Sequence, residues 1–158
     1  MRPRIRSMTL EDKSAVMDIL RATPEFTPQE VLVAGELCDY FLEDPIGSGY
    51  QVFVAEADSA VAGYICYGPT PLTEGTWDVY WMAVAPDKQR HGIGRVLLAF
   101  AEAKIKKTSG RQILIETSSK PNYERTRLFY LAQGYAAICQ IPNFYTIGDD
   151  LVIMQKNL

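Results

Sequence analysis

The sequence predicts a mixed α/β fold, an α+β arrangement of one mixed sheet with helices, in a single domain that spans residues 1–158. Three observations support this fold class. Segments rich in valine, isoleucine and aromatic residues are followed by segments whose apolar residues recur at helical spacing. A strand-like segment, 76–84, leads through a glycine-containing loop directly into a long helical segment, 93–107. No internal repeat or linker divides the chain, whose length suffices for one hydrophobic core.

The composition narrows the class of protein. Hydrophobic residues make up 47% and charged residues 22%, as in ordinary globular proteins. No apolar run approaches the ~18 residues that cross a bilayer, and no secretory signal follows the basic N-terminus, so we expect a cytoplasmic protein without a membrane partner. The net charge of −3 argues against nucleic-acid binding.

The scarcity of histidine and of closely spaced cysteines argues against a metal site. The chain has one histidine, and its three cysteines, Cys38, Cys66 and Cys139, form no CxxC pair. A structural zinc site and a disulfide framework are therefore not expected. We expect all three cysteines to lie in the core.

Two helices are predicted after a short opening strand, 5–8. Thr9 can cap the first helix, with Asp12 at the third helical position. Thr27 can cap the second, with a proline at the first helical position and Glu30 at the third. Both helices carry an apolar stripe, so each is expected to pack against the sheet.

The central part of the chain changes to the pattern of strands. Segments 51–57 and 60–67 are rich in β-branched and aromatic residues, and the Asp-Ser pair at 58–59 between them predicts a hairpin. A third strand, 76–84, follows a loop that contains proline and glycine. The helix over 93–107 ends in a lysine-rich turn that suits the negative end of its dipole.

The last part of the chain predicts one buried strand, one helix and two closing strands. Residues 112–117 are nearly all apolar, as in a strand buried on both faces. A helix is expected over 121–133, ended by Gly134, and closing strands over 135–141 and 151–155. The predicted order is β-α-α-β-β-β-α-β-α-β-β.

The loop between 76–84 and 93–107 carries the strongest functional signal. Gly92 and Gly94 let a backbone approach a bulky anion, and the free N–H groups of the following helical turn point at it. Arg90 and Arg95 flank the glycines and add full positive charges. A pyrophosphate is the ligand that this arrangement suits.

Nucleotide-binding loops begin in a similar way. A P-loop requires lysine and serine or threonine after the second glycine, whereas Arg95 and Val96 follow here. A dinucleotide-binding loop requires a third small residue where Leu97 stands, although Glu116 lies near the expected acidic position. A nucleotide-binding α/β domain therefore stays an alternative.

Three segments resemble the GNAT superfamily of N-acetyltransferases. Residues 89–94 (QRHGIG) resemble its Q/R-x-x-G-x-G/A acetyl-CoA motif, residues 82–86 resemble its central strand, and residues 128–135 are similar to its (L/F)Y-x-x-x-G-(F/Y) signature. The resemblance implies a GNAT-like fold with splayed central strands, here 76–84 and 112–117. It also implies transfer of an acetyl group from acetyl-CoA to a primary amine by direct attack in a ternary complex.

The resemblance assigns a set of residues to acetyl-CoA. Backbone groups at the end of the central strand would hold the pantetheine arm and the thioester carbonyl, and the glycine loop would hold the diphosphate. The implied cofactor-binding residues are Met82, Ala83, Val84, Gln89, Arg90, His91, Gly92, Ile93, Gly94, Arg95 and Asn122.

Tyr130 is the implied catalytic acid, because the family places a proton-donating tyrosine at this motif position. A phenol can protonate the departing thiolate without being ionised at rest. The acceptor amine must also lose a proton, and Asp78, Glu116 or water alone are the candidates for the base. Tyr80 is expected on the same face as Asp78, because side chains alternate along a strand.

The acceptor itself is not specified beyond an amine of a small molecule or a peptide. The segment 143–150 combines two aromatic and two acidic residues, and we interpret it as a turn rather than as an acceptor wall. Relatives are often dimers, so the resemblance leaves a homodimer open. A non-catalytic CoA-binding sensor is the alternative function.

Overall fold

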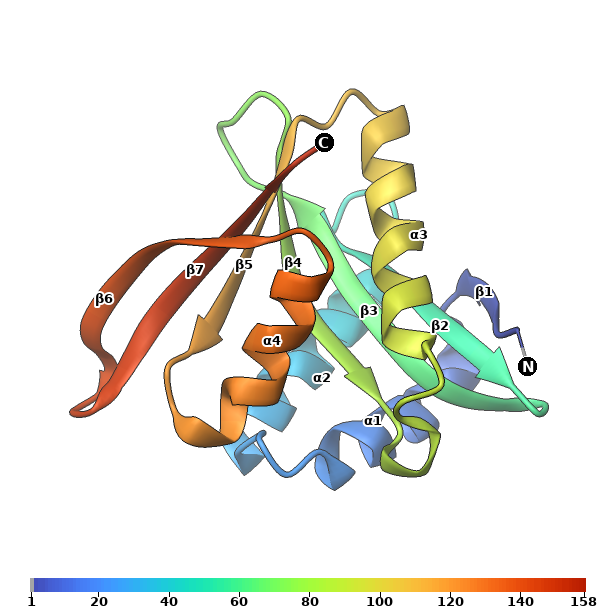
Figure 1. Ribbon diagram of the computed structural model, residues 1–158. Coiled ribbons are helices and arrows are strands. Elements are labelled where there is room, and N and C mark those ends of the chain that lie inside the picture. The colour runs from blue at the N-terminus through green and yellow to red at the C-terminus, as the bar shows by residue number, and fades with distance from the viewer. Residues whose placement is uncertain (1) are drawn as a thin grey trace.

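The computed structural model describes residues 2–158, which form one seven-stranded sheet in the order β1-β2-β3-β4-β5-β7-β6 with helices on both faces (Figure 1). Neighbouring strands are antiparallel except for β4 and β5, which are parallel. The strands are β1 (Arg4–Ser7), β2 (Gln51–Ala57), β3 (Ala60–Pro69), β4 (Thr76–Val84), β5 (Gln112–Ser118), β6 (Ala136–Thr146) and β7 (Asp149–Asn157). The helices are α1 (Lys13–Ala22), α2 (Pro28–Glu43), α3 (Ile93–Lys107) and α4 (Glu124–Ala132), with 3-10 turns η1 (Leu10–Asp12), η2 (Pro86–Lys88) and η3 (Pro121–Tyr123). This mixed α/β fold and its element order confirm the predicted fold class.

The two N-terminal helices begin where their caps predict. The Thr9 amide donates to the Asp12 carboxylate at 2.8 Å, and the turn η1 leads from there into α1. The Glu30 amide donates to the Thr27 hydroxyl at 3.2 Å, and α2 starts at Pro28. Local side-chain hydrogen bonds thus decide where both helices start.

The two faces of the sheet are covered by different helices. On one face, Leu97, Ala101 and Ile105 of α3 are buried against the middle of the sheet. On the other face, α1 and α2 bury residues such as Leu20 and Cys38 (Figure 1). Among residues 2–158, no helix is both long and apolar enough to cross a membrane.

The hairpin of β2 and β3 has the predicted two-residue turn. Asp58 and Ser59 both have positive φ angles, +53° and +63°, as a type I′ turn requires. Their short polar side chains tolerate this left-handed conformation better than most residues.

The closing hairpin differs from the prediction. Strands β6 and β7 extend well into the segment 143–150, which the sequence predicts to be a turn, and only a two-residue turn separates them. Pro142 fits inside β6 because β6 is an edge strand whose register shifts between Ile141 and Thr146. No helix covers this edge, so Cys139 is exposed rather than in the core, whereas the other two cysteines are buried.

A β-bulge at Tyr80 separates the two central strands. Tyr67 pairs with Val79 and the preceding Cys66 pairs with Trp81, so Tyr80 is an extra residue in β4. Side-chain alternation is therefore lost between Tyr80 and Trp81, which both pack toward α1 and α2. The parallel pairing of β4 with β5 runs only as far as Val79 and Ile115. Beyond this pair the strands diverge, because a bulge bends and twists the strand that carries it.

Candidate active site

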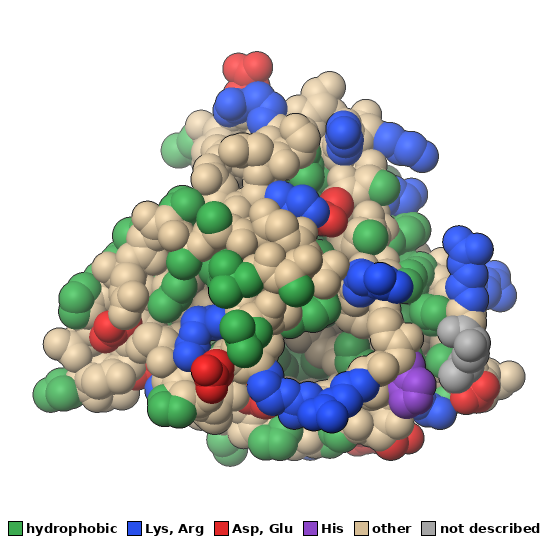
Figure 2. Space-filling model, viewed as in Figure 1, with side chains coloured by type: hydrophobic (Ala, Val, Ile, Leu, Met, Phe, Trp, Pro, Cys, Tyr) green, Lys and Arg blue, Asp and Glu red, His purple; other side chains and the backbone are tan. Residues whose placement is uncertain are grey.

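A cleft of about 920 Å³ opens where β4 and β5 diverge. Its walls come from the ends of both strands, the start of α3, the first turns of α4, the connection between α1 and α2, and the closing hairpin. Figure 2 shows the molecule hollowed between α3 and α4, with Lys and Arg side chains along the lower rim of the hollow.

The loop before α3 has the backbone of an anion site. Arg90 and Gly92 both have left-handed φ angles, +65° and +79°, with His91 between them. Such alternation turns successive N–H groups into one concave surface, and the free amides of the first turn of α3 extend it. A left-handed conformation is unfavourable for arginine, and such strain is characteristic of functional loops.

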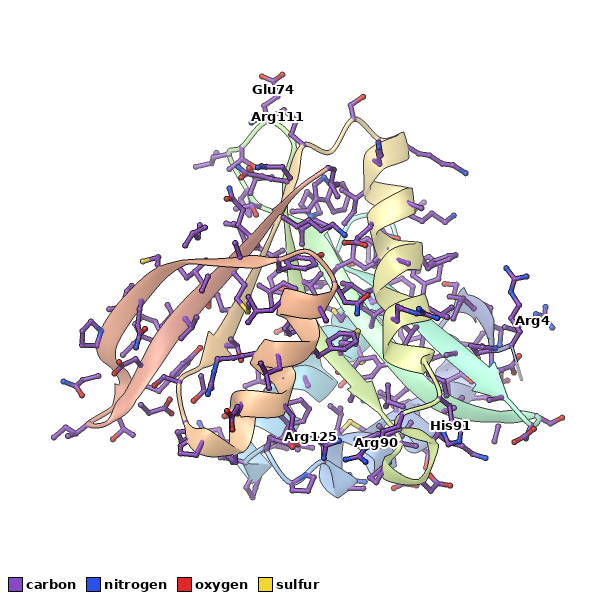
Figure 3. The ribbon with its side chains drawn as sticks, in the orientation of Figure 1. Arg4, Glu74, Arg90, His91, Arg111 and Arg125 are labelled. Atoms are coloured by element: carbon purple, nitrogen blue, oxygen red, sulfur yellow. The ribbon has the colours of Figure 1, made fainter. Side chains whose placement is uncertain are left out.

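Three arginines converge on this loop. Arg90 and Arg95 line the cleft from the loop and α3, and Arg125 lines it from the first turn of α4. Arg90 and Arg125 lie on either side of the mouth of the cleft (Figure 3). Within the part of the chain that is described, none of the three forms an ion pair. Uncompensated positive charges gathered at one mouth indicate an anionic ligand.

Sequence reasoning missed Arg125, because no motif of the sequence marks the start of α4 as a phosphate site. Arg125 lies thirty-five positions beyond Arg90 in the sequence. It reaches the same mouth only because α4 packs beside α3 (Figure 1).

Two residues implied by the resemblance do not line the cleft. The Nδ1 atom of His91 lies 2.9 Å from the Gln89 carbonyl oxygen, so the exposed ring braces the loop from outside. Asn122 is exposed, and the adjacent Tyr123 lines the cleft in its place. Gln89 lines the cleft and donates its side-chain amide to the Val84 carbonyl oxygen at 3.3 Å.

The two diverging strands form a groove with unused hydrogen-bonding capacity. Met82, Ala83 and Val84 line it from β4, and Thr117 lines it from β5. The Thr117 side chain is buried, and its hydroxyl has no hydrogen-bond partner among residues 2–158. A buried polar group without a partner is costly, and a ligand rich in amide groups would satisfy it.

Tyr130 lines the same cleft from α4. Only 6% of it is exposed, and its ring makes edge contacts with Phe129 and Tyr135, at centroid distances of 5.3 Å and 5.8 Å. Burial raises the pKa of the Tyr130 phenol above its ordinary value, because desolvation disfavours the phenolate. The side chain is therefore a protonated donor at neutral pH.

The two candidate bases differ in their surroundings. The Asp78 carboxylate accepts a hydrogen bond from the Thr70 hydroxyl at 2.6 Å. Glu116 follows the last residue of β5 that pairs with β4, is exposed and lines the cleft. Tyr80 lies beside Asp78, and burial together with the Asp78 charge raises the pKa of Tyr80 to about 12.

The closing hairpin is part of the cleft wall, contrary to its interpretation as a simple turn. Tyr145 and Asp149 both line the cleft. The Asp149 carboxylate accepts a hydrogen bond from the buried Ser118 hydroxyl, and the Lys120 ammonium lies 3.8 Å from it. These contacts attach the hairpin to the end of β5.

The chain resembles known acetyltransferases in sequence and fold. The profile of the acetyltransferase (GNAT) domain matches residues 48–137. A structure assigned to the GNAT family from Desulfovibrio desulfuricans is 42% identical, covers 98% of each chain and has a TM-score of 0.94. A ribosomal-protein-alanine N-acetyltransferase from Brucella melitensis is 26% identical, covers 98% of this chain and 99% of that chain, and has a TM-score of 0.79. The PaiA N-acetyltransferase of Thermoplasma acidophilum, in complex with coenzyme A, shares the fold at 19% identity, full coverage of both chains and a TM-score of 0.78. A search of curated protein sequences finds no match.

Proposed function

The chain belongs to the GNAT acetyltransferase family, and on that premise we propose that it moves the acetyl group of acetyl-CoA to a primary amine by direct attack in a ternary complex. The observation that carries the proposal is the divergence of β4 and β5 beyond Val79 and Ile115, with an anion-binding loop and the buried Tyr130 both on the resulting cleft. A diphosphate, an amide-bearing arm and a reacting thioester each find suitable groups along this single cleft.

Acetyl-CoA would be held by two sets of groups. The amides of the loop 89–94 and the three arginines would bind its phosphates through charge-assisted hydrogen bonds. The backbone of residues 82–84 and the Thr117 hydroxyl would bind the amide groups of the pantetheine arm. The unpartnered Thr117 hydroxyl supports this fit, because it needs a partner that the described chain does not supply.

Transfer needs two proton movements that residues of this chain can perform. The nitrogen lone pair of the neutral amine attacks the thioester carbon, the new C–N bond forms, and the C–S bond breaks. A carboxylate takes the proton that the amine loses, and Tyr130 donates a proton to the departing sulfur. Backbone N–H groups of β4 beyond the bulge would stabilise the charge that develops on the carbonyl oxygen.

Glu116 is our choice for the base. It lies where the strands have just separated, and its side chain has no hydrogen-bond partner within residues 2–158. Asp78 lies on the paired side of the bulge, and its carboxylate is already bonded to Thr70. A base must be free to reach the amine, which favours Glu116.

The proposal is tested by following thiol release from acetyl-CoA with a panel of amines, together with calorimetric titration of acetyl-CoA. We expect tight binding of acetyl-CoA and thiol release that depends on the amine. Binding without thiol release from any amine would instead indicate a non-catalytic CoA-binding domain. Tighter binding of ATP or NAD than of acetyl-CoA would contradict the assignment of the anion loop.

A further inference from the structure

The cleft is lined by two groups of charged side chains, which we call the arginine end and the acidic end. The arginine end consists of Arg90, Arg95 and Arg125. The acidic end is formed by carboxylates from three separate parts of the chain: Glu25, Glu30, Glu116 and Asp149. Under the proposed function the phosphates of acetyl-CoA lie at the arginine end, which leaves the acidic end for the acceptor.

Most of the charge at the acidic end is not neutralised by the protein. Lys120 is the one cation there that pairs, and it pairs with Asp149. Glu25, Glu30 and Glu116 form no ion pair within residues 2–158. Like charges that share a cleft repel one another, and a ligand that carries positive charge removes this repulsion.

Two tyrosines lie near these acidic residues. Burial and the charges of Glu116, Asp149 and Glu30 raise the pKa of Tyr145 to about 12. The Tyr123 hydroxyl lies 3.2 Å from the Glu25 carbonyl oxygen and 3.3 Å from the Glu30 carboxylate. Tyr123 therefore joins the start of α4 to the connection between α1 and α2, and ties the two walls of the cleft together at this end.

Four aromatic side chains also line the cleft on the side of α1 and α2. Phe26 and Trp81 line the cleft and pack edge to face, with their ring centroids 5.4 Å apart. Tyr50 and Tyr80 line it and make a similar contact at 5.5 Å. Rings of this kind bind methylene groups and attract organic cations through their faces.

Two further observations bear on the kind of ligand that this cleft takes. The buried Thr117 hydroxyl beside Glu116 lines the cleft without a partner in the described chain. No group of three His, Cys, Asp or Glu side chains among residues 2–158 has the geometry of a metal site. Several carboxylates spread around aromatic walls suit a cation whose charges are spaced along an apolar chain.

We propose, on the basis of the proposed function, that the acceptor is a small alkyl polyamine. One amino group reacts beside Glu116 and Tyr130, while a second, distant ammonium group is held by Glu30 at the acidic end. The methylene spacer lies along the aromatic wall formed by Phe26 and Trp81.

An extended peptide fits this end less well. Such peptides often bind by pairing with free strand edges. In the cleft, free edges occur on β4 and β5 beyond Val79 and Ile115. The proposed function assigns these edges to the pantetheine arm.

The test compares amines of equal length that differ in one charge. With saturating acetyl-CoA, thiol release is measured for 1,6-diaminohexane and hexylamine, for spermidine, and for a short peptide whose single amine is its N-terminus. We expect kcat/KM to be about tenfold higher for the diamine than for the monoamine, as one charged hydrogen bond predicts. Glu30→Gln should remove most of this preference, whereas Glu36→Gln, an exposed position on the same helix outside the cleft, should retain it.

The outcomes separate this inference from the proposed function. Equal kcat/KM for the diamine and the monoamine, or faster acetylation of the peptide than of any polyamine, would overturn the polyamine inference and leave amine acetylation intact. Calorimetry of spermidine with the protein and CoA provides a readout that does not depend on transfer. Spermidine binding that is weakened by Glu30→Gln, without thiol release, would support the polyamine site and contradict the proposed function.

Discussion

Val79 of β4 and Ile115 of β5 form the last pair of the parallel ladder, and the two strands separate directly beyond it. The extra residue Tyr80 follows Val79, so the bulge and the separation coincide. The candidate base Glu116, the groove lined by residues 82–84 and the unpartnered Thr117 all lie on the open side of this pair. One local irregularity thus creates the cleft, and the following predictions test what the cleft does.

Thr117→Val should have opposite effects on stability and on ligand binding. Valine keeps the volume but removes a buried hydroxyl without a partner, so the free energy of unfolding of the ligand-free protein should rise by about 1 kcal/mol. The affinity for acetyl-CoA should fall several-fold, about threefold to tenfold, because a hydrogen bond to the ligand is lost. Denaturant unfolding and calorimetry measure the two effects.

Thr76→Val is the matched control for Thr117→Val. The buried Thr76 hydroxyl accepts a hydrogen bond from the Gln112 side chain at 2.9 Å and lies outside the cleft. Its loss should lower stability and leave the affinity for acetyl-CoA unchanged. If Thr117→Val also leaves that affinity unchanged, the Thr117 hydroxyl does not contact the ligand.

Tyr130→Phe should lower kcat by about 10²-fold or more while the affinity for acetyl-CoA changes little, because only proton donation is removed. The protonated phenol is the active form, and burial raises its pKa. The kcat of the unmodified enzyme should therefore not fall as the pH rises to the ordinary tyrosine pKa of about 10. The control is Tyr135→Phe, because the Tyr135 hydroxyl donates to the Glu102 carboxylate outside the cleft. A kcat unaffected by Tyr130→Phe would exclude the donor role.

Glu116→Gln should reduce kcat more than Asp78→Asn does. Glutamine keeps the size of the side chain but cannot accept the amine proton, so we expect a loss of about 10²-fold. Asp78→Asn should have a smaller effect, since Asp78 is hydrogen-bonded to Thr70. Steady-state kinetics over a range of pH compare the two variants. A larger loss of kcat in Asp78→Asn than in Glu116→Gln would identify Asp78 of β4 as the base instead.

The double charge reversal Arg90→Glu with Arg95→Glu should abolish measurable binding of acetyl-CoA, because it places negative charge beside the phosphates. Arg125→Gln should raise the KM for acetyl-CoA, with a smaller effect at high salt, because salt screens exposed charges. Arg4→Gln changes an exposed charge far from the mouth and should have no effect (Figure 3). Normal affinity in the double variant would show that the loop does not hold the phosphates.

The sequence predicts much of the fold because its signals are local. The boundaries of β2, β4 and α3 agree with the prediction, since period, caps and turn residues act over a few positions. The closing hairpin was mispredicted because Pro142 is a strand breaker in a central strand but not in an edge strand, and edge position is decided by the sheet order. Cys139 is exposed for the same reason.

The candidate site was predicted in part. Residues of the anion loop and Tyr130 lie on the cleft, as their motifs suggest, whereas His91 and Asn122 lie off it. A motif specifies residue types and spacing but not the direction of each side chain.

The sequence by itself determined the turn that precedes α3, because its glycines, the flanking arginines and the helix start are neighbours along the chain. Only the tertiary structure decided what faces that loop across the cleft. Arg125, Thr117 and Tyr145 meet the loop and the acidic end because a bulge opens the sheet and because β5, α4 and the closing hairpin pack around the opening. Such convergence depends on contacts between residues far apart in sequence, for which short-range patterns carry no signal.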